Sequence, residues 1–377
     1  MFKHLGPILT PALVVFVSQM VTAGQTLPPA AQWVPQDAVI SVELSGPKVL
    51  LDLFAGEKAI AAITALPAYQ GQVSNPKLKE FLNLVRFLEA TLETDWRTGL
   101  ARLTGGGITF AVCPKNTVLL IIDAEDERIL ERLHETFLTF ARAEAEKQGQ
   151  PDRVTSRQYR DVTAWTFDGK EVHAIIGRRF IFANRPEGLK AVLDLRAQTG
   201  GASLASKSSY QAAKREADPD AVAMIFADLK PLMGLPQVAQ LLDQQRKNPL
   251  AALAFAGIVE AVRDSNWLAL GLSIRDSTLV LRASADGEMV AQTSPAAFAL
   301  PKGSGEGVLP NLSVPRRIAA LTLYRDLHQF YVAKDDLFPE RTSGLIFFEN
   351  MMGIFFSGRD LTDEVLAETK PELRFVV

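Results

Sequence analysis

A cluster of polar side chains follows a predicted strand near residue 326. Asp326 and His328 stand two residues apart, directly after Tyr324 and Arg325. A carboxylate and an imidazole form the pair that general acid–base catalysis uses, because the imidazole exchanges a proton near neutral pH. A catalytic or metal site needs further ligands, and the sequence supplies none at a recognisable spacing. We therefore favour a solvated loop or strand end for this pair and keep a hydrolase as an alternative function.

A second polar cluster consists of Asp123, Glu125, Asp126 and Glu127. Carboxylate oxygens are the ligands that calcium prefers, but this cluster lacks the alternating spacing and the central glycine of a calcium loop. Acidic residues at the start of a helix also cap it and oppose its dipole. Capping is the preferred interpretation, and the sequence predicts no metal.

Other residues with chemical potential lack a supporting motif. His134 is followed by Glu135, but no histidine stands four residues further on, so the zinc-protease pattern is missing. His173 alternates within a predicted strand. Cys113 ends a predicted strand and, as the only cysteine, cannot form an internal disulfide. The glycine stretches match neither a dinucleotide fingerprint nor a phosphate loop, so no cofactor is predicted.

A cluster of large apolar residues could line a pocket for an apolar ligand. Helical core packing would explain the same residues, because their spacing also suits a helix. The cluster contains Phe347, Phe348, Met351, Met352, Phe355 and Phe356.

The first residues have the pattern of an export signal. Lys3 and His4 precede an apolar stretch, and Val21, Thr22 and Ala23 provide the small-residue cleavage pattern. We expect a signal peptide over residues 1–23 and a tether over residues 24–35. The apolar stretch is shorter than the roughly 20 residues that a membrane span needs. An uncleaved anchor is the alternative, and after cleavage no membrane span is expected.

The amino-acid composition limits the classes of partner that the protein is expected to bind. The chain has 40 basic and 43 acidic side chains and is 47% hydrophobic, which is typical of a globular protein. No basic cluster is interleaved with aromatic residues, so nucleic acid is excluded as an expected partner. An unknown protein or an apolar ligand remains. The predicted location is the periplasm or the outside of a bacterial cell.

Internal similarity organises the rest of the chain into about three related units. Asp37–Val39 and Asp220–Val222 open strands whose apolar residues alternate at the same positions, at an offset of 183 residues. Ile318 begins a degenerate third copy. The predicted divisions are residues 36–204, 205–290 and 315–377, with a linker loop over 291–314. Strands mixed with helices on one face indicate an α+β fold with antiparallel or mixed sheets.

Each unit is expected to contain a strand, helices and a hairpin. Apolar residues from Leu78 to Leu103 keep one helical stripe, which predicts a continuous helix. Hairpins are predicted at residues 108–122 and 267–283. Asp360 to Val377 aligns on Asp95 to Val112 at an offset of 265, so the third unit is either incomplete or ends in a native C-terminal strand.

The signal segment, the Asp-Ala-Val strand openings, the glycines before Ile108 and the paired hairpins resemble a family of exported bacterial repeat proteins of unknown function. The resemblance covers most of the chain from Val34 onward. Its motifs are apolar patterns, so it implies no activity and no functional residues.

Three functions remain open. The first choice is an exported, non-enzymatic protein whose repeated sheets present a surface for binding or for envelope structure, because repeats build extended faces without catalytic clusters. The second is a carrier of an apolar ligand, and the third is a hydrolase. An exposed apolar patch favours the first, an apolar cavity the second, and convergent polar groups in a cleft the third.

Overall fold

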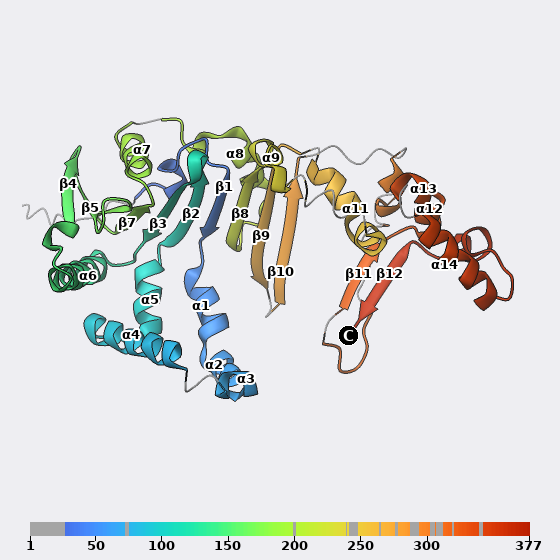
Figure 1. The fold of residues 1–377 in the computed structure, drawn as a ribbon, viewed down its shortest axis with the longest axis horizontal. Coiled ribbons are helices and arrows are strands. Elements are labelled where there is room, and N and C mark those ends of the chain that lie inside the picture. The colour runs from blue at the N-terminus through green and yellow to red at the C-terminus, as the bar shows by residue number, and fades with distance from the viewer. Residues whose placement is uncertain are drawn as a thin grey trace, which may run out of the picture.

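The alternating apolar segments form strands of one ten-stranded antiparallel sheet in a computed structural model of the chain (Figure 1). The structure describes residues 27–377 except 72–74, 199–200, 239, 241–247, 264, 276–277, 287–293, 302–305, 307–311, 319 and 339–341. The predicted signal peptide, the start of the tether and much of the linker loop lie outside the described residues. The fold is α+β with an antiparallel sheet, as the sequence predicts, but helices lie on both faces of the sheet and not on one face only.

The strand order is β10-β9-β8-β1-β2-β3-β7-β6-β5-β4. The strands are β1 (Ile40–Leu44), β2 (Gly107–Cys113), β3 (Thr117–Asp123), β4 (Thr155–Tyr159), β5 (Val162–Thr166), β6 (Val172–Ile176), β7 (Arg179–Ala183), β8 (Ala221–Asp228), β9 (Trp267–Arg275) and β10 (Thr278–Ala285). The predicted hairpins are present as β2–β3 and β9–β10.

The middle of the sheet is locally symmetric. β1 pairs with β8 in an antiparallel register that places Val42 opposite Ile225. Ile40 is opposite Ala227 and Leu44 is opposite Ala223. At the offset of 183, Ile40 corresponds to Ala223 and Leu44 corresponds to Ala227. Ile40 is therefore opposite the counterpart of Leu44, and Leu44 is opposite the counterpart of Ile40. This register is what a two-fold relation between the first two predicted units requires, although the three-unit repeat itself stays a prediction.

One face of the sheet packs against α7 (Pro186–Ala197) and α8 (Ser208–Glu216), and we call it the α7 face. Leu189, Val192 and Leu193 of α7 are almost fully buried in the main core. Each such side chain contributes about 1.5–3 kcal/mol by leaving water. Tyr210 of α8 packs edge-on against Phe226, with ring centroids 5.5 Å apart. The main core therefore lies between the α7 face and these helices.

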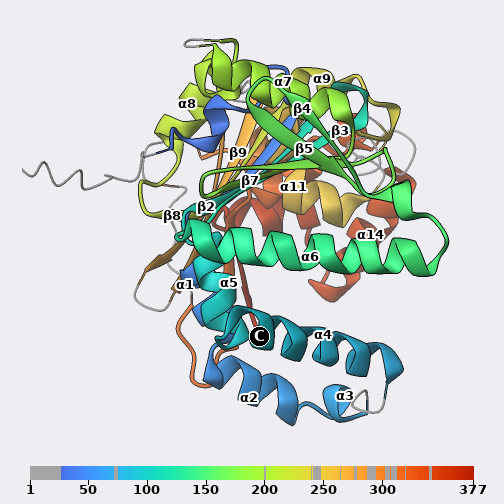
Figure 2. The same cartoon turned by 90° about the vertical axis from the view of Figure 1, so that its left-hand side faces the viewer.

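The opposite face, which we call the α6 face, is covered over only part of its width. Figure 2 shows α7 and α8 on one side of the sheet and α6 (Glu127–Lys147) on the other. α1 (Pro47–Ala55) and α5 (Trp96–Thr104) extend from the ends of β1 and β2 and pack on each other. α2 (Glu57–Ala65), α3 (Pro67–Gln70) and α4 (Pro76–Leu92) continue below them (Figure 1).

The prediction of one continuous helix from Leu78 to Leu103 is wrong. α4 ends at Leu92, Glu93 has a φ of 53°, and α5 begins at Trp96. The carboxylate of Asp95 accepts hydrogen bonds from the backbone N–H groups of Arg97 and Thr98, so it caps a new helix. The apolar residues of α5 continue the helical spacing of α4, so the hydrophobic pattern does not reveal the boundary between the two helices.

The C-terminal region forms a separate sheet of β11 (Ala320–Tyr324) and β12 (Glu372–Val376) beside the β10 end of the large sheet (Figure 1). Its helices are α12 (Leu327–Val332), α13 (Lys334–Leu337) and α14 (Thr342–Phe355), and α9 (Leu229–Met233) and α11 (Pro249–Arg263) precede it.

Two details of this region follow the predicted offset of 265. Leu373, the counterpart of Ile108 at this offset, is opposite Leu323 of β11, just as Ile108 is opposite Leu44 of β1, although Leu323 and Leu44 are 279 residues apart. Asp360 accepts from the N–H of Asp363, as Asp95 accepts from that of Thr98. No helix among the described residues is long and apolar enough to cross a membrane.

Candidate functional site

An apolar pocket of about 330 Å³ lies between α5, α6 and the α6 face of the sheet. The amphipathic pattern of α6 places one stripe of its side chains, including Leu130 and Leu133, toward the sheet. The helices contribute Leu100, Leu103, Thr104, Leu130, Leu133, His134 and Phe137, and the sheet region contributes Ile122, Phe167, Glu171, His173, Phe180 and Phe182. We call this space the α6 pocket. Its lining suits an apolar molecule, and its volume falls within the range of about 300–1,000 Å³ usual for small-molecule sites.

Two histidines meet at the α6 pocket. The Nε2 atoms of His134, on α6, and His173, on β6, are 3.0 Å apart. One imidazole N–H can donate to the lone pair of the other only while the acceptor is neutral. His173 is only 4% exposed and contacts the rings of Phe167 and Phe180. This hydrogen bond joins the helix to the sheet at the edge of the pocket.

The surroundings keep both histidines neutral. Burial, together with the charge that His134 would carry, lowers the pKa of His173 to about 4. Burial also lowers the pKa of His134, helped by Arg142 and opposed by Glu135. Both imidazoles are therefore uncharged at neutral pH, which matches the apolar character of the pocket.

A polar cleft lies on the other side of His134. Its lining includes Glu131, Glu135, Asp161, Arg142 and Arg196. Arg196 makes a two-pronged ion pair with Asp161. The guanidinium of Arg142 lies 5.3 Å from the centre of the Trp165 ring. His134 thus separates an apolar pocket from a cleft that contains charges of both signs.

The acidic cluster has structural roles. Asp123 forms a two-pronged ion pair with Arg179, whose side chain is fully buried and stacks on Trp33. Asp126 caps α6 through the N–H of Arg128 and also pairs with Arg102. The side chain of Glu125 lies against Gly105. Among the described residues no group of three or more metal-ligating side chains comes together.

Asp326 and His328 each contact another residue of the C-terminal region. The Asp326 carboxylate caps α12 by accepting from the N–H of Gln329. The His328 Nε2 atom is 3.8 Å from an Asp363 carboxylate oxygen. Arg325 is buried and donates to the backbone carbonyls of Leu253, Ala254, Ala299 and Tyr324, so it fixes α11 and the 3-10 helix η5 (Pro295–Ala299) to the end of β11.

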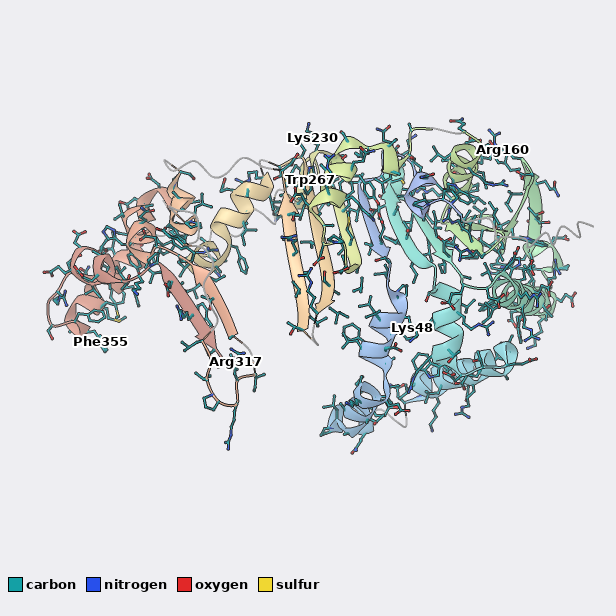
Figure 3. The ribbon with its side chains drawn as sticks, turned by 180° about the vertical axis from the view of Figure 1, so that it is seen from behind. Lys48, Arg160, Lys230, Trp267, Arg317 and Phe355 are labelled. Atoms are coloured by element: carbon teal, nitrogen blue, oxygen red, sulfur yellow. The ribbon has the colours of Figure 1, made fainter. Side chains whose placement is uncertain are left out.

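The Phe and Met cluster belongs to α14, which is a helix as predicted. Met352 and Phe356 pack against the C-terminal core. Phe347 and Phe355 are 71% and 76% exposed, and Phe348 and Met351 are exposed as well. Figure 3 shows Phe355 at the outer end of the C-terminal region, at the opposite end of the molecule from Arg160. The ligand-lining role of this cluster stays a prediction.

Cys113 is buried at the end of β2, and burial raises the pKa of its thiol to about 12. A thiol with this pKa carries almost no thiolate at neutral pH, so it is unreactive.

Residues 8–306 match the family described as "Protein of unknown function (DUF3352)". The chain belongs to this family. The match to DUF3352 includes both halves of the large sheet, and the C-terminal sheet lies outside the matched residues. A search of curated proteins finds no match.

One solved structure, crystal form I of TP0453, is similar at 10% identity, with 68% of this chain and 77% of that chain covered. Its TM-score is 0.31, so the likeness carries no argument about the fold or the function of this DUF3352 protein.

Sequence reasoning did not identify the α6 pocket. His134 and His173 are 39 residues apart and share no motif. His134 fits the pattern of an amphipathic helix, and His173 fits the alternating pattern of a strand. The available signal was the apolar stripe of α6, which showed that the helix packs on the sheet but not that a space remains beneath it.

Proposed function

We propose that this protein is an exported, non-enzymatic carrier that binds an apolar ligand in the α6 pocket. The observation that carries the proposal is the pocket itself, whose lining consists mainly of Leu, Ile and Phe side chains between a helix and a sheet. Burial of apolar ligand surface there contributes about 25 cal/mol per Å². The proposal of export rests on the signal-like sequence at residues 1–23.

The polar candidates support binding over catalysis. Asp123 and Asp126 already have Arg179, Arg102 and the α6 N-terminus as partners. The Asp326 carboxylate caps α12 by accepting a hydrogen bond from the backbone N–H of Gln329. His134 and His173 form a close pair of titratable side chains at the pocket, and both are held neutral. These roles position helices and strands around the pocket.

Native mass spectrometry of gently purified protein tests the proposal. We expect an added mass that organic solvent removes, or, for protein recovered bare, binding of added octanoate at one site. Protein that is recovered bare and does not bind octanoate would contradict the proposal.

A second candidate function, binding of a protein partner at an exposed surface, is supported by α14. Its outward side chains Phe347, Ile354 and Phe355 are more than two-thirds exposed. Exposed apolar patches commonly mark interaction sites. Chemical crosslinking in intact cells tests this candidate. A crosslinked partner that is lost in a Phe347→Asp, Phe355→Asp variant is expected, and an unchanged crosslinking pattern would reject the α14 surface.

A further inference from the structure

Another pocket lies on the α7 face of the sheet, between the β4–β5 hairpin and α7, which lie beside each other in Figure 2. Its volume is about 400 Å³, within the range of about 300–1,000 Å³ usual for small-molecule sites. Its deepest lining residues are Val172 of β6 and Leu189 and Leu193 of α7, which also belong to the main core. We call this space the α7 pocket.

Hydrogen bonds hold the hairpin on the helix, so the walls of the α7 pocket are already in place. The Tyr159 hydroxyl, at the end of β4, donates to an Asp194 carboxylate oxygen over 2.9 Å. Arg160, in the hairpin turn, donates to the same oxygen from its Nε atom over 2.8 Å. The Tyr159 ring also packs against the main core. A ligand therefore meets a site that is largely pre-organised, which lowers the cost of binding.

Two basic side chains line the α7 pocket, one from each wall. Arg157 belongs to β4 and Lys190 to α7. Arg157 stands two residues before Tyr159, so both side chains lie on the same face of the strand. The Nζ atom of Lys190 is 5.8 Å from the centre of the Tyr159 ring. Both cations are therefore placed around the Tyr159 side of the pocket.

The α7 pocket contains no acidic group that would neutralise these cations. Neither aspartate nor glutamate is among the described residues that line it. Within the part of the chain that the structure describes, Arg157 makes no hydrogen bond or ion pair. Asp194, one helical turn after Lys190, is already paired with Arg160 at 2.6 Å. The pocket thus combines two positive charges with an apolar interior, and the α6 pocket has no basic side chain in its described lining.

We infer that the α7 pocket binds a small organic phosphate, with its phosphate group between Arg157 and Lys190 and its apolar part against the leucines of α7. A phosphate monoester carries about −1.5 to −2 charges near neutral pH, which two cations can neutralise. The arginine fork suits two phosphate oxygens at once, and the lysine adds a point charge. This site is separate from the α6 pocket, and the inference does not rest on the proposed function.

Calorimetric titration with phenyl phosphate and with inorganic phosphate tests this assignment. Arg157→Gln removes one cation of the pocket. Arg215→Gln, at an exposed position in the last turn of α8 outside the pocket, is the control with the same change of net charge. We expect Arg157→Gln to weaken phenyl phosphate binding about tenfold and Arg215→Gln to leave it unchanged. The wild-type protein should bind phenyl phosphate about tenfold more tightly than inorganic phosphate, because the ring leaves water.

The parts of the inference can be overturned separately. Absence of phenyl phosphate binding by the wild-type protein, or equal affinities of the two variants, would contradict the site. Equal binding of phenyl phosphate and inorganic phosphate would contradict the role of the apolar interior. Octanoate binding should not change in Arg157→Gln, and a tenfold loss would overturn the assignment to phosphate. Loss of octanoate binding alone would reject only the proposed function.

Hydrogen exchange of the wild-type protein covers the case in which Arg157→Gln does not fold. An excess of phenyl phosphate should slow exchange in β4 and α7 and leave α5 and α6 unchanged. Slower exchange confined to α5 and α6, or no change in any segment, would contradict the inference.

Discussion

The two halves of the large sheet meet at Val42 and Ile225 and share a strand pattern, but helices cover them differently. On the β1–β3 side, α5 and α6 lie on the α6 face and leave the pocket beneath them. On the β8–β10 side, α11 packs instead against the 3-10 helix η5 (Pro295–Ala299) and α9. Ile225 and Leu281 are consequently exposed. Similar strands thus produce either a pocket or an open apolar surface, depending on where the connecting helices go.

Two aspartates at corresponding ends of the halves show the same difference. In the β2–β3 hairpin Ile122 is opposite Ile108, and in the β9–β10 hairpin Ala285 is opposite Leu268. Asp123 follows Ile122 and Asp286 follows Ala285, so the two aspartates occupy matching positions in the two hairpins. Asp123 neutralises the buried guanidinium of Arg179. Asp286 accepts from the backbone N–H groups of Asn266 and Trp267 near the surface. At this position the covered half has a buried ion pair, whereas the open half has hydrogen bonds from the backbone.

The largest effect is expected when this ion pair is broken. Asp123→Ala should lower the free energy of unfolding by about 3–5 kcal/mol, because it leaves a buried guanidinium without its partner. Asp286→Ala, which removes hydrogen bonds only, should cost about 1–2 kcal/mol. Urea denaturation measures both changes. Equal losses of unfolding free energy in the two variants would contradict the distinction between the halves. Stability of the wild-type protein that depends on calcium would support a metal-binding role for Asp123.

Leucine truncation compares the helix-covered surface with the open one. Leu130, a residue of α6 that lines the pocket, is 6% exposed, and Leu281 on β10 is 71% exposed. Leu130→Ala should cost about 2–5 kcal/mol through lost burial and a larger cavity. Leu281→Ala should change stability by less than about 0.5 kcal/mol. Thermal and urea unfolding measure these values, and a large cost at Leu281 would mean that something covers the open half.

Acid should loosen the covered half selectively. The pKa of His173 is about 4 in the folded protein and 6.5 for the free side chain. The unfolded state therefore takes up a proton first, and up to about 3 kcal/mol of stability is lost as the pH falls from about 6.5 to 4. Below pH 4 this contribution is constant. Hydrogen exchange should show α6 opening in acid while β9 and β10 change less.

A His173→Phe variant provides the control for the acid effect. Its neutral ring keeps the aromatic contacts but cannot take up a proton, so the pH dependence of α6 exchange should largely disappear. An unchanged pH dependence would assign the effect to other groups near His134, such as Glu135 and Arg142.

Local patterns predicted the strands and hairpins well, because alternation over β2 and β3 specifies which face is buried. They failed at Glu93, where the apolar stripe continues in phase across a helix break. The cap was nevertheless visible, since Asp95 stands three residues before Thr98. The pairing of Val42 with Ile225 joins residues at the offset of 183, and Leu373 of β12 is at the offset of 265 from Ile108, while the three-unit repeat stays a prediction.

The pocket could not be predicted in the same way. Its walls come from α5, β3, α6 and β6–β7, and their spacing depends on how the helices pack rather than on any local pattern. Arg179 and Asp123 are 56 residues apart, so their ion pair carried no sequence signal. The sequence instead drew attention to Asp326 and to α14, where adjacent residues form conspicuous clusters.

Calorimetric titration of octanoate into two matched α6 variants tests ligand binding in the pocket most directly. Phe137 lines the pocket and is 47% exposed, whereas Phe140 on the same helix is 52% exposed and packs on Phe87 outside it. Phe137→Asp should weaken binding about tenfold or more, because a carboxylate in an apolar lining costs well over 1 kcal/mol. Phe140→Asp should leave it unchanged. Equal affinities of the two variants, or no octanoate binding by the wild type, would contradict a carrier function for the α6 pocket.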